Sequence, residues 1–171
     1  MKRHEMRFTG AGGQGIILAS VILTEAALIA GFNGVQSQSY GPEARGGVCK
    51  AEVIVCEGEI GFAKVVNPTF LMALTQSSLD RYSVGLDKDC VIIADSSLIA
   101  PKGVDVIFKP IIETAKTKIG KSFVSNIVAL GAINAHLNLV PPEALKEAVL
   151  KYVPKGTDEI NIKALEAGAA L

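Results

Sequence analysis

The sequence predicts an α/β fold: a three-layer α/β/α arrangement with a mixed, mostly parallel, Rossmann-like sheet and a helical C-terminal part. A glycine-rich loop at residues 10–15 lies between a short β-prone segment and a helix-forming segment. Residues 90–95 are a continuous apolar run, which is typical of a strand that is buried on both faces of a sheet. From residue 113 onward the pattern is helical. Strands early in the chain and helices on both sides of them favour this layered architecture.

The first strand is expected at about residues 5–9, and the loop after it reads GAGGQG. This loop leads directly into an apolar helix predicted over residues 16–30, which Gly31 should end as a C-cap. Glycines let the backbone approach a ligand closely, and a helix start presents unpaired N–H groups and the positive end of its dipole. Strand, loop and helix together therefore predict a site for an anionic group such as a phosphate.

A second strand is expected at about residues 34–39, followed by a charged, glycine-rich loop at residues 40–47. Residues 48–56 alternate loosely and predict a third strand. A Glu-Gly-Glu turn then leads into an apolar segment at residues 60–66. We expect these last two segments to form a β-hairpin, which would make the sheet mixed.

After this hairpin, Asn67 and Pro68 look like the cap and first residue of a helix that runs through Leu79. The remaining predicted elements are strands at residues 90–95 and 104–108 and helices at residues 111–119, 122–136, 142–153 and 158–170. Residues 95–97 lie at the carboxyl end of a central strand, where ligands of open α/β sheets collect. Because no repeat or linker interrupts the chain, residues 1–171 should form a single domain.

The composition excludes several classes of function. The 171 residues contain 17 Lys and Arg against 17 Asp and Glu, aromatic residues make up 5%, and Trp is absent, so we expect no nucleic-acid binding. The longest apolar helical stretch is too short to span a membrane. With 49% hydrophobic residues and a mean hydropathy of +0.37, some apolar surface is expected to belong to a partner protein.

The three cysteines, Cys49, Cys56 and Cys90, are scattered and form no C-x-x-C pair. We therefore expect buried free thiols, with neither zinc nor an iron–sulfur cluster on this chain. The first residues lead into a strand without the apolar region of a secretion signal, so the protein is expected to stay in the cytoplasm.

Gly10, Gly12 and Gly15 match the dinucleotide fingerprint G-x-G-x-x-G, after a strand and at the start of a helix. The fingerprint also expects an acidic residue about 20 residues further on, which holds the ribose. No Asp or Glu occurs in the second strand before Glu43. A stand-alone NAD- or flavin-dependent reductase therefore remains an alternative, as does a ligand-free assembly scaffold in which the glycines only permit a tight turn.

Two further residues are candidates for the same site. Arg45 lies in the second glycine-rich loop, beside Gly46 and Gly47, and could hold a phosphate with two hydrogen bonds if both loops leave one edge of the sheet. Asn126, near the start of a late helix, could donate a hydrogen bond to a ligand or serve as the helix cap. Residues 120–122 read Gly-Lys-Ser but lack the first glycine of a P-loop.

Taken together, GAGGQG at residues 10–15, SYGPEARGG at residues 39–47, and Asn126 opening a helix that contains Leu130 and Gly131 resemble one family. The chain is similar to the gamma subunit of the 2-oxoacid:ferredoxin oxidoreductases, over nearly its whole length. The form of the second loop looks most like the 2-oxoglutarate branch, with pyruvate the substrate of a related branch.

This resemblance implies a subunit that is not active alone and carries no catalytic residue or metal ligand of its own. It implies that the assembled enzyme oxidatively decarboxylates a 2-oxoacid to an acyl-CoA and passes electrons to ferredoxin. Thiamine diphosphate, Mg and iron–sulfur clusters would lie on alpha, beta and delta-type partner subunits, in an assembly that could be dimeric. Coenzyme A would be bound partly by this chain, through the residues Gly10, Ala11, Gly12, Gly13, Gln14, Gly15, Arg45, Gly46, Gly47 and Asn126. Relatives with lysines in the second loop differ here, where this chain has Glu43 and Ala44.

Overall fold

The structure, a computed structural model, describes residues 3–39 and 47–171. The elements in chain order are β1 His4–Ala11, α1 Ile16–Ile29, β2 Asn33–Ser39, β3 Val48–Cys56, β4 Phe70–Ala73, α2 Gln76–Tyr82, β5 Val91–Asp95, β6 Ile107–Lys109, α3 Ile111–Thr117, the 3-10 helix η1 Ser122–Val124, α4 Ser125–Leu137, α5 Pro142–Tyr152 and α6 Asp158–Ala169. No helix among these has the length and apolar character needed to cross a membrane.

Six strands form one sheet in the order β2-β3-β1-β4-β5-β6. The neighbours β1-β4, β4-β5 and β5-β6 are parallel, whereas β3 runs antiparallel to both β1 and β2. The sheet is therefore mixed and mostly parallel, and the predicted fold class is confirmed.

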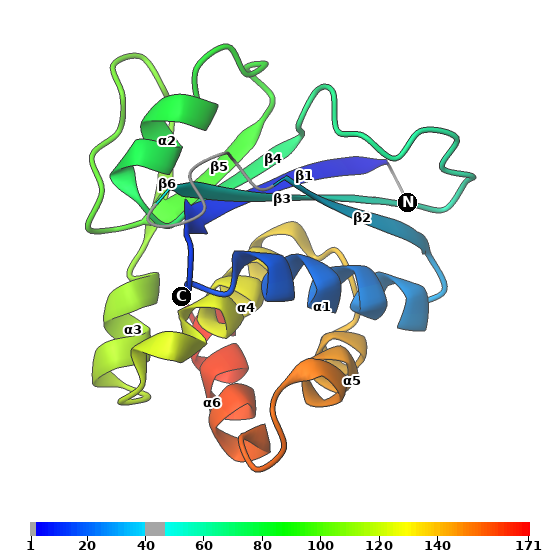
Figure 1. Cartoon of the computed structure of the whole chain (residues 1–171), viewed down its shortest axis with the longest axis vertical. Coiled ribbons are helices and arrows are strands. Elements are labelled where there is room, and N and C mark those ends of the chain that lie inside the picture. The colour runs from blue at the N-terminus through cyan, green and yellow to red at the C-terminus, as the bar shows by residue number, and fades with distance from the viewer. Residues whose placement is uncertain (1–2, 40–46) are drawn as a thin grey trace.

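The two faces of the sheet are covered unequally (Figure 1). Helix α2 lies on one face, while α1 and α4 lie against the other, with α5 and α6 further out. The main core forms between the sheet and α1 and α4, from side chains such as Phe8, Ile22 and Ile133. A smaller apolar cluster under α2 contains Leu71, Leu79 and Ile92. Most of the core thus lies on the side of the sheet that α1 and α4 cover.

The predicted hairpin of residues 48–56 and 60–66 is wrong. Residues 48–56 do form β3, but this strand pairs with β2 on one side and with β1 on the other, so neither of its edges remains for another strand. Within residues 60–66 only Val65 is buried, and Phe62 and Val66 are 61% and 65% exposed. In this fold the hairpin is therefore formed by β2 and β3, and the second glycine-rich loop connects these two strands.

The predicted helix starting at Asn67 is also wrong. Residues 70–73 form β4, which lies between β1 and β5 and is buried at all four positions. Helix α2 begins only at Gln76, where the Thr75 side chain caps it by accepting from the N–H of Ser78. A short apolar run that is buried on both faces has the same local pattern in a strand and in a helix, and here the sheet decides. The strand predicted at residues 104–108 is displaced, since β6 is Ile107–Lys109.

Beside α2, the sheet carries a cluster of charges that is nearly closed to solvent. Arg7 on β1 and Lys50 on β3 both reach one carboxylate oxygen of Glu52, with nitrogen–oxygen distances of 2.9 and 3.0 Å. The guanidinium of Arg7 also lies 5.6 Å from the ring centre of Tyr82 on α2. The side chain of Glu52 is 6% exposed, so two cations depend on one buried carboxylate.

We expect Glu52→Gln to lower the free energy of unfolding by about 2 kcal/mol, because it leaves Arg7 and Lys50 without a counter-charge in a poorly hydrated place. The shape and one hydrogen-bond acceptor are kept, which limits the loss. Chemical denaturation of the purified chain measures it, with Glu59→Gln on an exposed loop as the control. Equal stability of both variants would mean that water already screens the cluster.

Candidate functional site

Both glycine-rich loops start from one edge of the sheet. Strands β1 and β2 are each antiparallel to β3 and therefore run in the same direction. Thr9 near the end of β1 and Ser39 at the end of β2 lie opposite the same residue of β3, Lys50. Gly47 precedes Val48, which pairs with Ala11. The described ends of the two loops thus meet at the carboxyl edge of the sheet, as the sequence predicted.

The first loop is closed by its own glutamine. The carboxamide oxygen of Gln14 accepts a hydrogen bond from the N–H of Ala11 at 2.7 Å, and the N–H of Gln14 donates to the carbonyl of Ala11 at 3.2 Å. A Cβ on Gly10 would lie 2.5 Å from that carboxamide oxygen. Gly10 and Gln14 therefore fix the shape of the loop, whereas Gly12 and Gly13 form its tip.

The tip of the loop is open. A Cβ on Gly12 would meet no heavy atom within 4 Å, and the same holds for Gly13, whose φ of +89° belongs to the left-handed region. Both residues are exposed. Space for a ligand therefore exists directly above the backbone at this point.

Helix α1 begins next to this open space without a cap. Gly15 occupies the N-cap position at φ 71° and has no side chain that could accept from the first N–H groups, and the first turn contains no acidic residue. The first N–H groups of a helix have no partner within it, and the dipole adds partial positive charge. This arrangement suits an anionic group held by backbone N–H groups.

Asn126 supports the same loop from α4. Its Nδ2 donates to the carbonyl of Gly15 at 3.3 Å, across 111 residues of sequence. A Cβ on Gly15 would lie 2.4 Å from this nitrogen, so only glycine permits the contact. The interpretation of Asn126 as a helix cap is wrong: Val124 holds the N-cap position of α4, and no side chain caps this helix.

The oxygen of this amide has no partner in the described part of the chain. Asn126 is 3% exposed, and its Oδ1 accepts no hydrogen bond from any residue that the structure describes. Buried amide oxygens are nearly always hydrogen-bonded, so an orphan beside an open loop indicates a missing donor. Arg45 and Gly46 lie outside the described residues, and of the second loop only Gly47 is placed.

Asp95, at the carboxyl end of β5, has a structural role. Its two carboxylate oxygens accept from the N–H and hydroxyl of Ser97 at 3.0 and 2.6 Å and from the N–H of Ile112 at 2.7 Å. The last of these bonds holds the start of α3. Because the carboxylate is 2% exposed and fully engaged, the ligand position suggested by residues 95–97 is not at this side chain.

The cysteines are free thiols. Burial is the main cause that raises the pKa of the Cys90 thiol to about 11, and burial also raises the pKa of Cys49. Both thiols are therefore neutral near pH 7 and are poor nucleophiles. Across residues 3–39 and 47–171, no group of three His, Cys, Asp or Glu side chains could hold a metal ion.

Comparison with protein families identifies the chain. The model of the family described as pyruvate ferredoxin/flavodoxin oxidoreductase matches residues 5–171. The chain belongs to this family. The matched range includes both glycine-rich loops and Asn126.

Two relatives match nearly the whole chain. The 2-oxoglutarate synthase subunit KorC of Methanocaldococcus jannaschii is 43% identical over 97% of this chain and 92% of its own length. The crystal structure of the keto/oxoacid ferredoxin oxidoreductase gamma subunit from Geobacter sulfurreducens PCA is 46% identical, with a TM-score of 0.88 and coverage of 98% of this chain and 95% of that chain. The chain is thus a gamma-type subunit within the oxidoreductase family, and such a subunit implies other subunits.

A more distant neighbour shares the fold. The 2-oxoglutarate:ferredoxin oxidoreductase from Magnetococcus marinus, solved with 2-oxoglutarate, coenzyme A and succinyl-CoA bound, has a TM-score of 0.88 at 21% identity. The match covers 99% of this chain but 31% of that one. In that enzyme, the fold is therefore one part of a longer polypeptide. Neither this structure nor the closer relatives support a stand-alone NAD- or flavin-dependent reductase.

Proposed function

We propose that this chain binds coenzyme A for a 2-oxoglutarate:ferredoxin oxidoreductase made of several subunits. The assembled enzyme would decarboxylate 2-oxoglutarate, transfer the acyl group to coenzyme A and pass the electrons to ferredoxin. The choice of 2-oxoglutarate is supported by the similarity to KorC over nearly the full length of both chains.

One observation carries the coenzyme A assignment: the uncapped start of α1 lies beside the open tip of the glycine loop, with the orphan Oδ1 of Asn126 behind it. The diphosphate of coenzyme A is an anion that accepts hydrogen bonds from backbone N–H groups. Its pantetheine arm carries amide N–H groups, which are donors of the kind that Asn126 Oδ1 lacks. An NAD-binding site would instead need an acidic residue that binds the ribose hydroxyls, and β2 contains no acidic residue.

The proposed contact residues are those at the edge where both loops meet. They are Gly10, Ala11, Gly12, Gly13, Gln14, Gly15, Arg45, Gly46, Gly47 and Asn126. Arg45 and Gly46 are included on the sequence argument alone. Gly10 and Gln14 shape the loop, whereas Gly12, Gly13 and the N–H groups that follow them would face the diphosphate.

The chain supplies no catalytic residue in this proposal. Alpha, beta and delta-type subunits would carry thiamine diphosphate, Mg and the iron–sulfur clusters, and the thiol of coenzyme A would be presented to them. We further propose that residues 1–171 act as one domain, that the complex is dimeric and that it works in the cytoplasm.

The test starts from a tagged chain purified from its own cells. We expect partner chains to copurify and the sample to show iron–sulfur absorption. Ferredoxin reduction by the complex should require both 2-oxoglutarate and coenzyme A, whereas the isolated chain should not reduce ferredoxin. In the complex, Arg45→Ala should weaken coenzyme A binding about ten-fold in calorimetry, because a charge-assisted hydrogen bond to phosphate is lost. Arg81→Ala, at an exposed position on α2, is the control.

Three results would contradict the proposal in different ways. Turnover by the single chain would make it an independent enzyme. Copurifying partners without any coenzyme A binding would leave only a scaffold. Unchanged affinity in Arg45→Ala, with binding intact, would remove Arg45 from the site.

A further inference from the structure

The two edges of the sheet differ in how well they are protected. Strand β6 is three residues long, ends in Lys109 and is followed by Pro110, and all three features hinder pairing with a further strand. Strand β2 is seven residues long, contains neither a charged residue nor a proline, and keeps an unbroken register with β3. Within residues 3–39 and 47–171 no strand lies on its other side. The edge formed by β2 is therefore open to pairing with a strand of another chain.

Helix α1 continues this uncharged edge. Residues 14–39, which include α1 and β2, contain one charged residue, Glu25, whereas 20% of the whole chain is charged. The carboxylate of Glu25 is already bound, because it accepts from Lys151 at 2.6 Å and from the hydroxyl of Tyr152 at 3.1 Å. The cores of protein interfaces are depleted of charged residues. An uncharged strip of this length therefore indicates a contact surface.

The outer side of α1 carries an apolar stripe. The helix contacts β2 through Ser20, whose Oγ accepts from Gln36 at 3.2 Å, and it contacts α5 through Glu25. Between these two contacts, residues at helical spacing form one side of the helix. They are Ile17, Val21 and Leu28. The first two are half-buried and Leu28 is 49% exposed, so the stripe is accessible beside the edge of β2.

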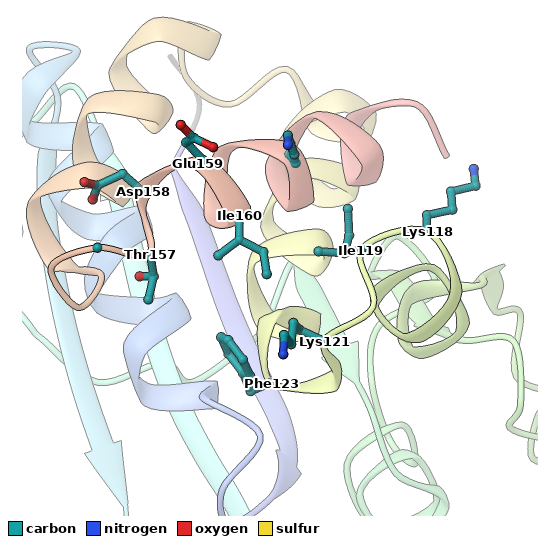
Figure 2. Close-up of a pocket in the computed structure, with 10 residues that line it drawn as sticks. Lys118, Ile119, Lys121, Phe123, Thr157, Asp158, Glu159 and Ile160 are labelled. Carbon is teal, nitrogen blue, oxygen red and sulfur yellow. The ribbon is translucent and has the colours of Figure 1, made fainter.

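Apolar exposure elsewhere on the molecule is accompanied by charge. Phe123 is 58% exposed in a groove of about 810 Å³ between η1 and α6 (Figure 2). Half of the ten residues that line this groove are charged, namely Lys118, Lys121, Asp158, Glu159 and Lys163. Mixed charges beside an exposed apolar side chain are typical of a solvated surface. The lack of charge, more than the exposure, thus distinguishes β2 and α1.

The same edge on a second copy of the chain has the matching shape and chemistry. Two β2 strands paired antiparallel about a two-fold axis would join two six-stranded sheets into one. Helix α1 packs under both β2 and β3 (Figure 1). Since paired strands are about 4.8 Å apart, the two α1 helices would lie about 10 Å apart, which is the usual distance between packed helices. No like charges would meet along these strands or stripes.

We propose that this chain associates with a second copy of itself through β2 and the outer stripe of α1. The inference rests on the proposed function, because it names the contact surface of the dimer proposed there. Gln36 is in the middle of β2, so a two-fold axis passes close to it when the strands overlap fully. Val21 then faces the same residue of the second copy, because Ser20 beside it contacts Gln36. The carboxyl edges of the two sheets point in opposite directions.

Sedimentation of the purified chain over a range of concentrations tests this contact. We expect wild type to dimerise. Val21→Lys and Val21→Glu should each weaken dimerisation about ten-fold or more, since two like charges then meet near the axis. An equimolar mixture of the two variants should recover wild-type association, because each lysine then faces a glutamate. Phe123→Lys, which replaces an exposed apolar side chain in the charged groove, is the matched control.

Two further measurements examine the strand and the stripe. Amide hydrogen exchange in β2 should be slower in wild type than in Val21→Lys, whereas β6 should exchange equally in both. Leu28→Lys, at an exposed position, should also weaken dimerisation. Thermal unfolding should show that these variants keep the fold, since lysine and glutamate are better helix formers than valine.

Three outcomes would each overturn the inference: a monomeric wild type, Val21 variants that dimerise as wild type does, or a mixture of the two variants that stays monomeric. Calorimetry with coenzyme A on the assembled complex judges the proposed function separately. Coenzyme A binding without dimerisation through β2 would leave the proposed function standing and refute this contact. Dimerisation through β2 without coenzyme A binding would refute the proposed ligand and leave this contact standing.

Discussion

Replacing Gly12 by valine is expected to reduce the affinity of the complex for coenzyme A about 100-fold while leaving the fold intact. Gly12 is exposed, its φ is outside the left-handed region, and a Cβ there meets nothing within 4 Å. Valine therefore fits the free protein. It would occupy the space above the loop where the diphosphate must approach the N–H groups, and losing one or two charge-assisted hydrogen bonds corresponds to this factor.

The control for this prediction is Gly61→Val. Gly61 lies in the loop between β3 and β4, is also exposed, and would likewise meet no atom within 4 Å of an added Cβ. Both variants should melt within about 2 °C of wild type, because neither creates strain. Full affinity for coenzyme A in Gly12→Val would show that the ligand does not lie on this loop.

The region around the first glycine-rich loop could be predicted from the sequence. A strand, a run of glycines and an apolar helix are adjacent in the chain, so their arrangement follows from local backbone preferences. The parallel direction of β1 and β2 required one further assumption, which the shared pairing with β3 confirms. The helices after residue 110 were also predicted within a few residues, since long helical segments carry their own periodicity.

The errors concern pairings between distant segments. Whether residues 60–66 or 34–39 pair with β3, and whether residues 70–73 enter the sheet, depends on which strand edges other parts of the chain occupy. Local signals such as Asn67 and Pro68 do not contain that information. The contact of Asn126 with Gly15 likewise joins segments far apart in sequence, so sequence could supply these two residues but not their contact.

The strongest effect on stability is expected where α4 crosses α6. A Cβ on Gly131 of α4 would lie 2.1 Å from the carbonyl oxygen of Leu165 and 2.8 Å from the nitrogen of Ala169. A Cβ on Gly168 of α6 would lie 2.0 Å from the carbonyl oxygen of Val128. All these neighbours are backbone atoms, which cannot rotate away as a side chain would, so the two helices need both glycines to approach this closely.

Gly131→Val should therefore lower the free energy of unfolding by about 3 kcal/mol or more, which lowers the melting temperature by about 10 °C. Gly131→Ala gives the sharper test of the cause. Helix propensity alone predicts that alanine stabilises α4 by about 1 kcal/mol, whereas the close packing predicts a loss. Thermal unfolding of the purified chain decides between the two signs, and stabilisation by alanine would mean that α6 moves aside at little cost.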